Sequence, residues 1–198
     1  MRKIDPGKQE IRRRKILDAA LACFARKGFS GTTTSEICSE AGMSPGHVFY
    51  YFPNKAAIIA AVVDDELREM SMLFSRVAGQ EDAIAAIETI ASELLDRSLD
   101  PVFVRINVEI SAEIMRNSEI GQLFAENEQH IKAELIELLE QGIRRGQIDP
   151  TISPASAATW LIALFDGLMN RALMDHSFLP EKHAPELMRM LRRYLEPS

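Results

Sequence analysis

Hydroxyl and ammonium groups that can bind phosphate gather in one short stretch of the chain, between residues 33 and 55. Hydroxyls and amines hydrogen-bond to phosphate oxygens, and small residues among them would let the backbone approach a duplex closely. The residues that we expect to form such a surface are Thr33, Thr34, Ser35, Ser44, Gly46, Tyr50, Tyr51 and Lys55.

Two short helices joined by a tight turn must position these side chains. Thr33 or Thr34 can cap the first of them, because a hydroxyl at the N-cap accepts a hydrogen bond from the first turn. Gly42 suits the turn, and Ser44-Pro45 reads as an N-cap followed by proline at the first helical position. A longer amphipathic helix precedes them. This arrangement predicts a helix–turn–helix at about residues 33–52, whose last helix would enter the major groove of DNA.

The chain as a whole shows the three- and four-residue apolar spacing of helices, without the alternation typical of strands. We therefore expect an all-α fold of about nine helices, with a helix–turn–helix domain at residues 1–55 and a larger helical domain at residues 56–198. Besides the two short helices, capping and proline signals predict helices at about residues 11–28, 55–77, 81–98, 101–115, 118–141, 154–176 and 184–195.

The chain is acidic overall, but its charge is unevenly distributed. Its 198 residues include 23 basic and 29 acidic side chains, for a formal net charge of −6. Residues 1–55 hold ten basic and five acidic side chains, a net charge of +5, and the remainder carries −11. A duplex would be attracted to the first part and repelled by the second, so the two parts are expected to have different partners.

Several other classes of protein find no support in the sequence. No apolar run approaches the roughly 20 residues of a membrane span, and none follows the basic N-terminus as in a secretory signal. Cys23 and Cys38 lack CxxC spacing, and the four histidines show no metal-ligand spacing. No nucleophile elbow, P-loop or dinucleotide-binding glycine pattern occurs. We therefore expect no enzyme, no metal site, no cofactor and no membrane partner.

The N-terminal part resembles the TetR family of bacterial transcriptional regulators. The resemblance is close over residues 10–60, and beyond them it extends only to architecture and to the Asp166-Gly167-Leu168 segment. It implies a dimeric DNA-binding repressor whose C-terminal domain binds a small molecule and then releases the operator. The segments that carry it are ILDAA (residues 16–20), GFSGTTTSEI (28–37) and AGMSPGHVFYYFPNK (41–55).

The resemblance also implies roles for single residues, and two positions depart from the family pattern. Phe49 replaces a usual tyrosine, which leaves van der Waals contact, for example with a thymine methyl. His47 either faces solvent beside the groove or donates a hydrogen bond to the duplex that strengthens as the pH falls. Phosphate contacts are implied for Thr34, Tyr51 and Lys55, base-edge contacts for Ser35, Pro45 and Gly46, and a place beside the backbone for Tyr50.

The last two long helices carry more apolar surface than one internal contact would bury. We expect them to form a four-helix dimer interface, with a purely internal core as the alternative. A two-fold dimer would place the recognition helices about 34–36 Å apart, or a multiple of that distance, on a pseudo-palindromic operator. The residues expected at the interface are Leu161, Leu164, Phe165, Leu168, Ala172, Leu187, Leu191 and Tyr194.

A cavity between the middle helices is the expected effector site. For each single residue proposed for it, ordinary core with solvated charges is the preferred explanation, and no ligand class follows from the sequence. Glu109 and Glu113 are one helical turn apart. They either bind a cationic ligand or pair with Arg105 or Arg116. The residues expected to line the cavity are Phe103, Ile106, Asn107, Ile110, Phe124, Trp160 and Phe165.

Taken together, these patterns predict a sequence-specific transcriptional regulator that binds DNA as a homodimer. We expect a repressor that an unidentified small-molecule effector releases from its operator. It would act in the bacterial cytoplasm, on the nucleoid when bound to DNA. The alternative is an all-α module that binds a protein or a ligand without DNA specificity, with Tyr50 and Tyr51 on a protein-binding surface.

Overall fold

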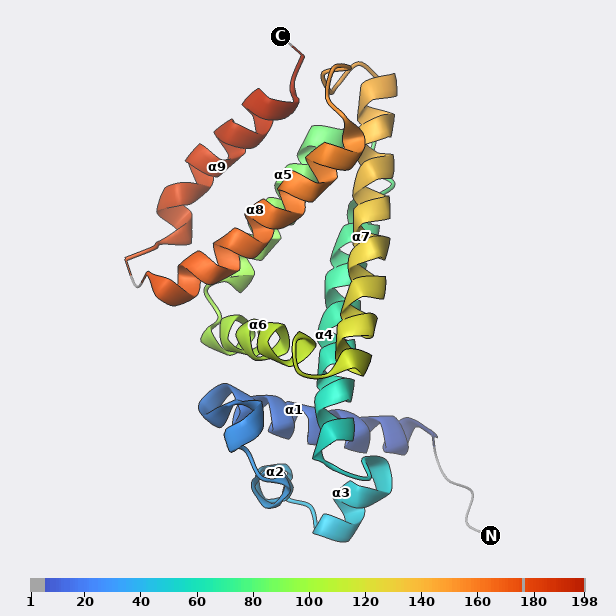
Figure 1. Ribbon diagram of the computed structural model, residues 1–198, viewed down its shortest axis with the longest axis vertical. Coiled ribbons are helices and arrows are strands. Elements are labelled where there is room, and N and C mark those ends of the chain that lie inside the picture. The colour runs from blue at the N-terminus through green and yellow to red at the C-terminus, as the bar shows by residue number, and fades with distance from the viewer. Residues whose placement is uncertain (1–5, 176, 198) are drawn as a thin grey trace.

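The structure is a computed structural model that describes residues 6–175 and 177–197. Within these residues the chain forms nine α-helices and no strand, which confirms the predicted all-α fold (Figure 1). None of these helices combines the length and the apolar character needed to cross a membrane. The helices are α1 (Pro6–Gly31), α2 (Thr34–Ala41), α3 (Pro45–Tyr51), α4 (Lys55–Val77), α5 (Ala83–Arg97), α6 (Pro101–Ile114), α7 (Ser118–Arg144), α8 (Pro154–Met174) and α9 (Pro180–Leu195).

The three N-terminal helices lie together at one end of the molecule, below α6 in Figure 1. Helix α1 packs against α2, α4 and α6, and its apolar face supplies the centre of a core that α2 and α3 complete. This core does not stop at residue 55, because side chains from α4, α6 and α7 are buried in it as well. Its fully buried members include Ile16, Leu17, Phe24, Ile37, Val48, Ile58, Val63 and Ile106.

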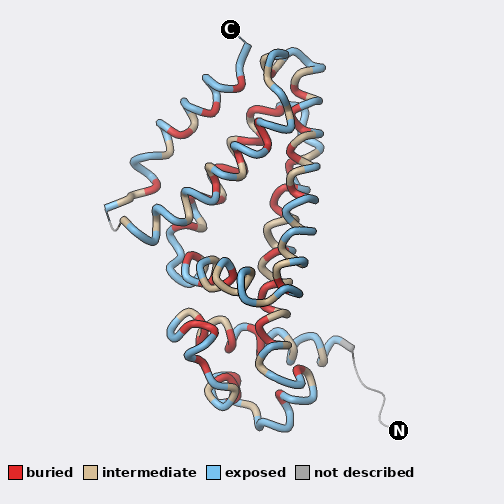
Figure 2. Tube along the Cα trace, in the orientation of Figure 1, coloured by how far each residue is buried: buried red, intermediate tan, exposed pale blue. Residues whose placement is uncertain are grey.

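A second core fills the larger part of the molecule, between α4, α5, α7, α8 and α9. Helix α5 lies at its centre, with Ala86, Ile87, Ile90 and Ala91 fully buried. Figure 2 shows buried positions on the inward sides of the surrounding helices and exposed positions on their outer sides. Helix α9 packs on α5 through residues spaced four apart, Leu187, Leu191 and Leu195.

The predicted helices agree with the observed ones except near some ends. Helix α1 runs past Gly28 to Gly31, with a break in its backbone at Gly28. Helix α9 begins at Pro180, earlier than predicted, and contains Pro185, because its buried leucine face outweighs the hydrogen bond that the proline removes. Helix α8 ends at Met174, and the end predicted for it at about residue 176 falls outside the described residues.

At the break in α1, the N-terminal helices contact α6. Gly28 has φ 75° and ψ 170°, a conformation that only glycine adopts readily. The freed N–H of Phe29 donates to Oε2 of Glu109 on α6 at 2.8 Å. A Cβ added at Gly28 would lie 2.6 Å from Oε1 of Glu109, so the carboxylate would have to shift if residue 28 carried a side chain.

We predict that Gly28→Ala destabilises the protein by about 1–3 kcal/mol through backbone strain, and further through the clash with Glu109. Urea denaturation measures the loss. Gly31→Ala is the matched control, because a Cβ there would meet only Cβ of Lys27 at an ordinary 3.6 Å. In a Glu109→Ala background the cost of Gly28→Ala should shrink. An unchanged cost there would show that the carboxylate does not constrain residue 28.

Candidate nucleic-acid interface and ligand cavity

Local hydrogen bonds build the turn between α2 and α3. Thr33 caps α2: its Oγ1 accepts the N–H of Glu36 at 3.3 Å, and the Glu36 carboxylate accepts the N–H of Thr33 at 2.8 Å. Gly42 follows in the left-handed conformation, with φ 62°, and its N–H donates to the carbonyl of Ser39 at 3.1 Å. Pro45 then begins α3 with Ser44 at the N-cap, and the hydroxyl of Ser44 makes no capping bond.

Helix α3 has one buried side and one exposed side. Val48 is fully buried and Phe52, just after the helix, is nearly so, which anchors α3 against α1 and α2. The opposite side leaves large aromatic groups in solvent: Phe49 is 44% exposed and Tyr50 63% exposed. A Cβ added at Gly46 would meet nothing within 4 Å, so this side is open to close approach. The exposed set expected from the sequence includes Pro45, Gly46, His47, Phe49 and Tyr50.

The other polar residues expected at this surface lie on α2, at the N-cap of α3 and at the end of α3. Thr33, Ser35 and Ser44 are exposed, and Thr34 is half-buried at the start of α2. The ring of Tyr51, also half-buried, meets the ring of Tyr50 edge to face, with centroids 5.1 Å apart. Exposed hydroxyl groups therefore lie at the start of α2 and at the N-cap of α3.

Lys55 has a structural contact that the sequence does not reveal. Its Nζ donates to the carbonyl oxygens of Phe29 at 3.0 Å and Thr32 at 2.9 Å, with Ser30 at 3.5 Å. These carbonyls belong to the end of α1 and the segment after it, where helical partners are lacking. The ammonium therefore ties the start of α4 to the end of α1, and a phosphate would have to compete for it.

Most cations of α1 are paired with acids of the same chain, whereas Arg12 and Lys15 have no such partner among the residues that the structure describes. Arg14 binds Asp18 and Asp65, and Arg26 binds Glu40. Arg12 and Lys15 are exposed and have no carboxylate within 4.0 Å among the described residues. Nζ of Lys15 lies 3.9 Å from the position of a Cβ at Gly42, beside the turn. The charge count of residues 1–55 does not distinguish paired from unpaired cations, and the structure does.

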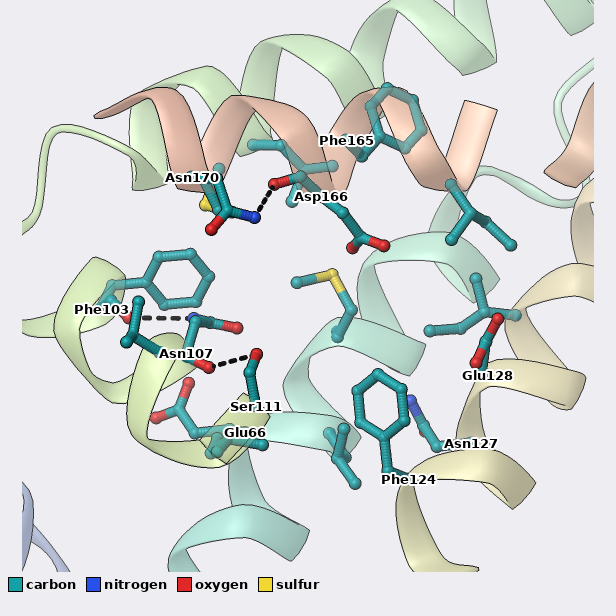
Figure 3. A pocket seen from close by; sticks show the side chains of 18 of the residues that line it. Glu66, Phe103, Asn107, Ser111, Phe124, Asn127, Glu128, Phe165, Asp166 and Asn170 are labelled. Carbon is teal, nitrogen blue, oxygen red and sulfur yellow. Dashed lines mark hydrogen bonds between the residues drawn. The ribbon is translucent and has the colours of Figure 1, made fainter. Parts of the chain in front are cut away.

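A cavity of about 290 Å³ opens between α4, α6, α7 and α8 (Figure 3). Five residues expected from the sequence line it: Phe103, Asn107, Ile110, Phe124 and Phe165. Two others do not. Ile106 is fully buried in the core around α1, since it is on the side of α6 that faces the N-terminal helices. Trp160 is 70% exposed on α8.

The acidic residues of the cavity were not expected. Glu66, Glu128 and Asp166 line it from α4, α7 and α8, with Asn127 and Asn170 close to the last two in sequence. The sequence does contain an indication that Glu66 faces inward. Glu66 falls at helical spacing among apolar residues that are buried on α4, namely Ile59, Val62, Val63 and Leu67. An acid on the apolar side of a helix indicates a polar site inside the fold.

Burial changes the ionisation of two of these carboxyl groups. The pKa of Glu66 is raised to about 7, first by burial and then by the nearby Glu69. Asp65 also raises it, whereas Arg97 and Arg14 oppose the shift. The pKa of Asp166 is raised by burial and by Glu128. Glu109 and Glu113, the acids that the sequence singled out, do not line this cavity.

The structure divides the residues expected at a dimer interface into two groups. Leu161, Phe165, Leu187 and Leu191 are buried within the chain, in the second core. Leu164, Leu168 and Ala172 are half-buried, and Tyr194 is 45% exposed. The outer sides of α8 and α9 instead expose other apolar groups, namely Trp160, Leu173, Met174 and Met190.

We predict that Glu66→Gln removes a pH-dependent destabilisation. A carboxyl group whose pKa rises from 4.5 to about 7 on folding costs stability as the pH increases through that interval. The variant should match the wild type near pH 4.5 and exceed it by about 1–2 kcal/mol at pH 8. Urea titrations at both pH values measure the difference. Glu137→Gln, an exposed change on α7, should show none. Equal pH profiles for wild type and Glu66→Gln would contradict the prediction.

Comparison with known proteins gives consistent matches along the chain. The sequence model described as bacterial regulatory proteins of the tetR family matches residues 16–62, which include α2 and α3. A second model, described as the C-terminal part of BetI-type transcriptional repressors, matches residues 83–196. The chain is 27% identical over 158 residues to the HTH-type transcriptional regulator UidR of Escherichia coli strain K12, covering 79% of each.

Two further relatives cover most of the chain. The HTH-type transcriptional regulator YfiR of Bacillus subtilis strain 168 is 26% identical over 173 residues, or 86% of this chain and 84% of that protein. The solved structure of GusR from Salmonella enterica superposes with a TM-score of 0.75 at 26% identity, covering 93% of this chain and 95% of that one. The family models, the relatives and the helix–turn–helix geometry agree, and the chain belongs to the TetR family of bacterial DNA-binding transcriptional regulators.

Proposed function

We propose that the protein is a dimeric repressor that an effector in its cavity releases from a pseudo-palindromic operator. The exposed side of α3 carries this proposal, because its aromatic and polar groups are held outward by the buried Val48 and Phe52. Residues 1–55 would act as the DNA-binding part and residues 56–198 as the sensing and dimerising part. Such a protein works in the bacterial cytoplasm, and on the nucleoid while bound.

The proposed contacts with DNA fall into two kinds. His47, Tyr50 and Phe49 are exposed on α3, where they would reach base edges and the adjoining backbone of the major groove. Arg12 and Lys15, the unpaired cations of α1, would bind phosphates together with the hydroxyls of α2 and the turn. Lys55 would act mainly by holding the end of α1 against α4. The acidic remainder, at −11, would keep the duplex at this end of the molecule.

Helix α6 would transmit effector binding from the cavity to the DNA-binding part, because it contacts both. This helix supplies Asn107 and Ser111 to the cavity, and between them Glu109 accepts the N–H of Phe29 in α1. Because a helix moves as a rigid element, a shift of α6 around an effector would displace α1. In a dimer that displacement would change the separation of the two recognition helices, which must match the half-site spacing of about 34–36 Å or a multiple.

We predict that His47→Ala weakens binding to the operator by about 1–3 kcal/mol and relaxes base preference near the contact. Lys15→Ala should instead weaken binding to all sequences and lower the salt dependence by about one counterion. Fluorescence anisotropy with DNA from upstream of the protein's own gene, and with random DNA, measures both. Gln129→Ala, an exposed change on α7, should bind as the wild type does. Equal affinity of the wild type for both DNAs would favour the module without DNA specificity.

The proposed dimer interface is the outer side of α8 and α9. On α8 the exposed Trp160, Ala163, Gly167 and Met174 are spaced along one side of the helix, and α9 exposes Met190. A large exposed apolar surface of this kind marks an interaction site. Small residues in the middle of the stripe would let two α8 helices approach closely.

We predict that Gly167→Lys converts the dimer to a monomer. A Cβ at Gly167 meets nothing within 4 Å in the chain, so lysine leaves the protomer intact. Across a two-fold axis the two lysines would meet, which should weaken dimerisation at least about tenfold. Size-exclusion chromatography with light scattering measures the mass, and Gln129→Lys should leave it unchanged. A Gly167→Lys protein that still elutes as a dimer would place the interface elsewhere.

A further inference from the structure

The cavity between α4, α6, α7 and α8 combines an apolar wall with an entirely acidic set of charges. Four phenylalanines and two methionines line it, and among its nineteen described lining residues there is no lysine, arginine or histidine. The charged residues are Glu66, Glu128 and Asp166, from three different helices. Figure 3 shows the carboxylate of Asp166 directed from α8 into the cavity, with Glu66 and Glu128 at other sides of it.

Among the described residues, these three carboxylates have no hydrogen-bond or ion-pair partner. No hydrogen bond or basic group within 4.0 Å engages Glu66, Glu128 or Asp166 among the residues that the structure describes. The neighbouring polar groups bond to their own helices: the amide of Asn107 donates to the carbonyl of Phe103 at 2.9 Å, and that of Asn170 to the carbonyl of Asp166 at 3.1 Å. The cavity thus presents hydrogen-bond acceptors and negative charge with few free donors.

The two arginines that act on Glu66 from outside the cavity, Arg14 and Arg97, are each engaged by other side chains. Arg14 on α1 binds Asp18 and Asp65. Arg97, at the end of α5, lies 3.8 Å from Glu69 and stacks over the ring of Phe103 at 5.4 Å. Neither lines the cavity, so among the described residues no basic side chain lies inside it beside the three carboxylates.

We propose that the cavity binds an organic cation, a protonated amine or quaternary ammonium on an apolar body. The cationic head would lie between Asp166 and Glu66, and the apolar body would lie against Phe124 and Phe165. Aromatic faces attract cations as well as apolar groups, so both kinds of lining favour this ligand. An anionic ligand would find no cation and would be repelled by three carboxylates. The inference rests on the proposed function insofar as this ligand is the effector.

The burial of Glu66 also makes cation binding depend on pH. An empty cavity leaves the pKa of Glu66 at about 7, with Glu69 and Asp65 raising it and Arg97 and Arg14 lowering it. A cation binds the ionised form, so its affinity should rise as the pH increases through 7, and binding should release a proton below that pH. Asp166 and Glu128 face the same space and repel each other's charge, which a bound cation would relieve.

Three probes of nearly equal shape test the proposal on the full-length protein without DNA. Benzyltrimethylammonium is permanently cationic, neopentylbenzene is its neutral isostere, and phenylmethanesulfonate is an anion of similar size. Isothermal titration calorimetry should give a dissociation constant below about 1 mM for the cation, at least about tenfold weaker binding of the neutral probe, and no binding of the anion. Cation affinity should also rise between pH 6 and pH 8.

Two isosteric variants locate the site. Asp166→Asn and Glu66→Gln should each weaken cation binding about tenfold and leave neopentylbenzene binding unchanged. Glu66→Gln should also abolish the rise in affinity between pH 6 and pH 8. Glu137→Gln, an acid-to-amide change on the exposed side of α7, should behave as the wild type does. Circular dichroism confirms that each variant is folded.

The outcomes separate the ligand class from the regulatory role. Equal or tighter binding of the neutral or anionic probe, absence of cation binding, or unchanged affinity in both cavity variants would overturn the proposal. DNA release is measured separately, by anisotropy of the operator complex with added cation. Cation binding without release would leave the ligand class standing and contradict the effector role. Release by the cation in the wild type, reduced in Asp166→Asn, would support both.

Discussion

Backbone groups left unpaired at and after the break in α1 need partners, and the partners that they have on α4 and α6 position the N-terminal helices on the rest of the molecule. The N–H of Phe29 is bound by the carboxylate of Glu109 on α6, and carbonyls of the same segment are bound by the ammonium of Lys55 on α4. Unpaired backbone groups inside a fold are costly, so these bonds are strongly favoured. Two opposite charges from two helices thus hold the N-terminal helices in one orientation on the body.

This junction lies between the two proposed binding sites. On one side, α1 supplies the core against which α2 and α3 pack. This packing buries one side of α3 and leaves its other side facing outward. On the other, α6 carries Asn107 and Ser111 into the cavity from the same turns that carry Glu109. The core around α1 includes residues of α4, α6 and α7. The proposed DNA-binding part is therefore not a separate domain joined by a flexible linker. Under the proposed function, this continuous packing would carry movement from one site to the other.

Charge is organised by pairing as well as by location. On α1 most cations neutralise acids of α1, α2 or α4, so the positive charge left for phosphates is smaller and more local than the +5 of residues 1–55 suggests. In the cavity the reverse holds, since three carboxylates face it and the nearest arginines are engaged outside it. Unpaired charge of opposite sign therefore occurs at the two ends of the proposed signal path, where ligands of opposite charge would neutralise it.

The helices and the helix–turn–helix were predictable because their signals are local. The Thr33 cap, Gly42 in its left-handed conformation and Pro45 at the start of α3 all act on neighbouring residues, and the structure shows each in the expected place. Predictions that depended on which side of a helix faces inward were less successful. Helices α6 and α8 each have apolar residues on more than one side, so periodicity did not distinguish Ile106, which is buried against α1, or Trp160, which is exposed, from residues of the cavity.

The sequence by itself thus determined the helices, the recognition motif, the family resemblance and the charge asymmetry, since these depend on residue type and short spacing. Only the tertiary structure decided which cations remain unpaired, that Lys55 and Glu109 bind backbone groups of one segment, and that Glu66, Glu128 and Asp166 share a cavity. These contacts join residues on helices far apart in the chain. Their partners are chosen by packing of the whole fold, and no local pattern records that choice.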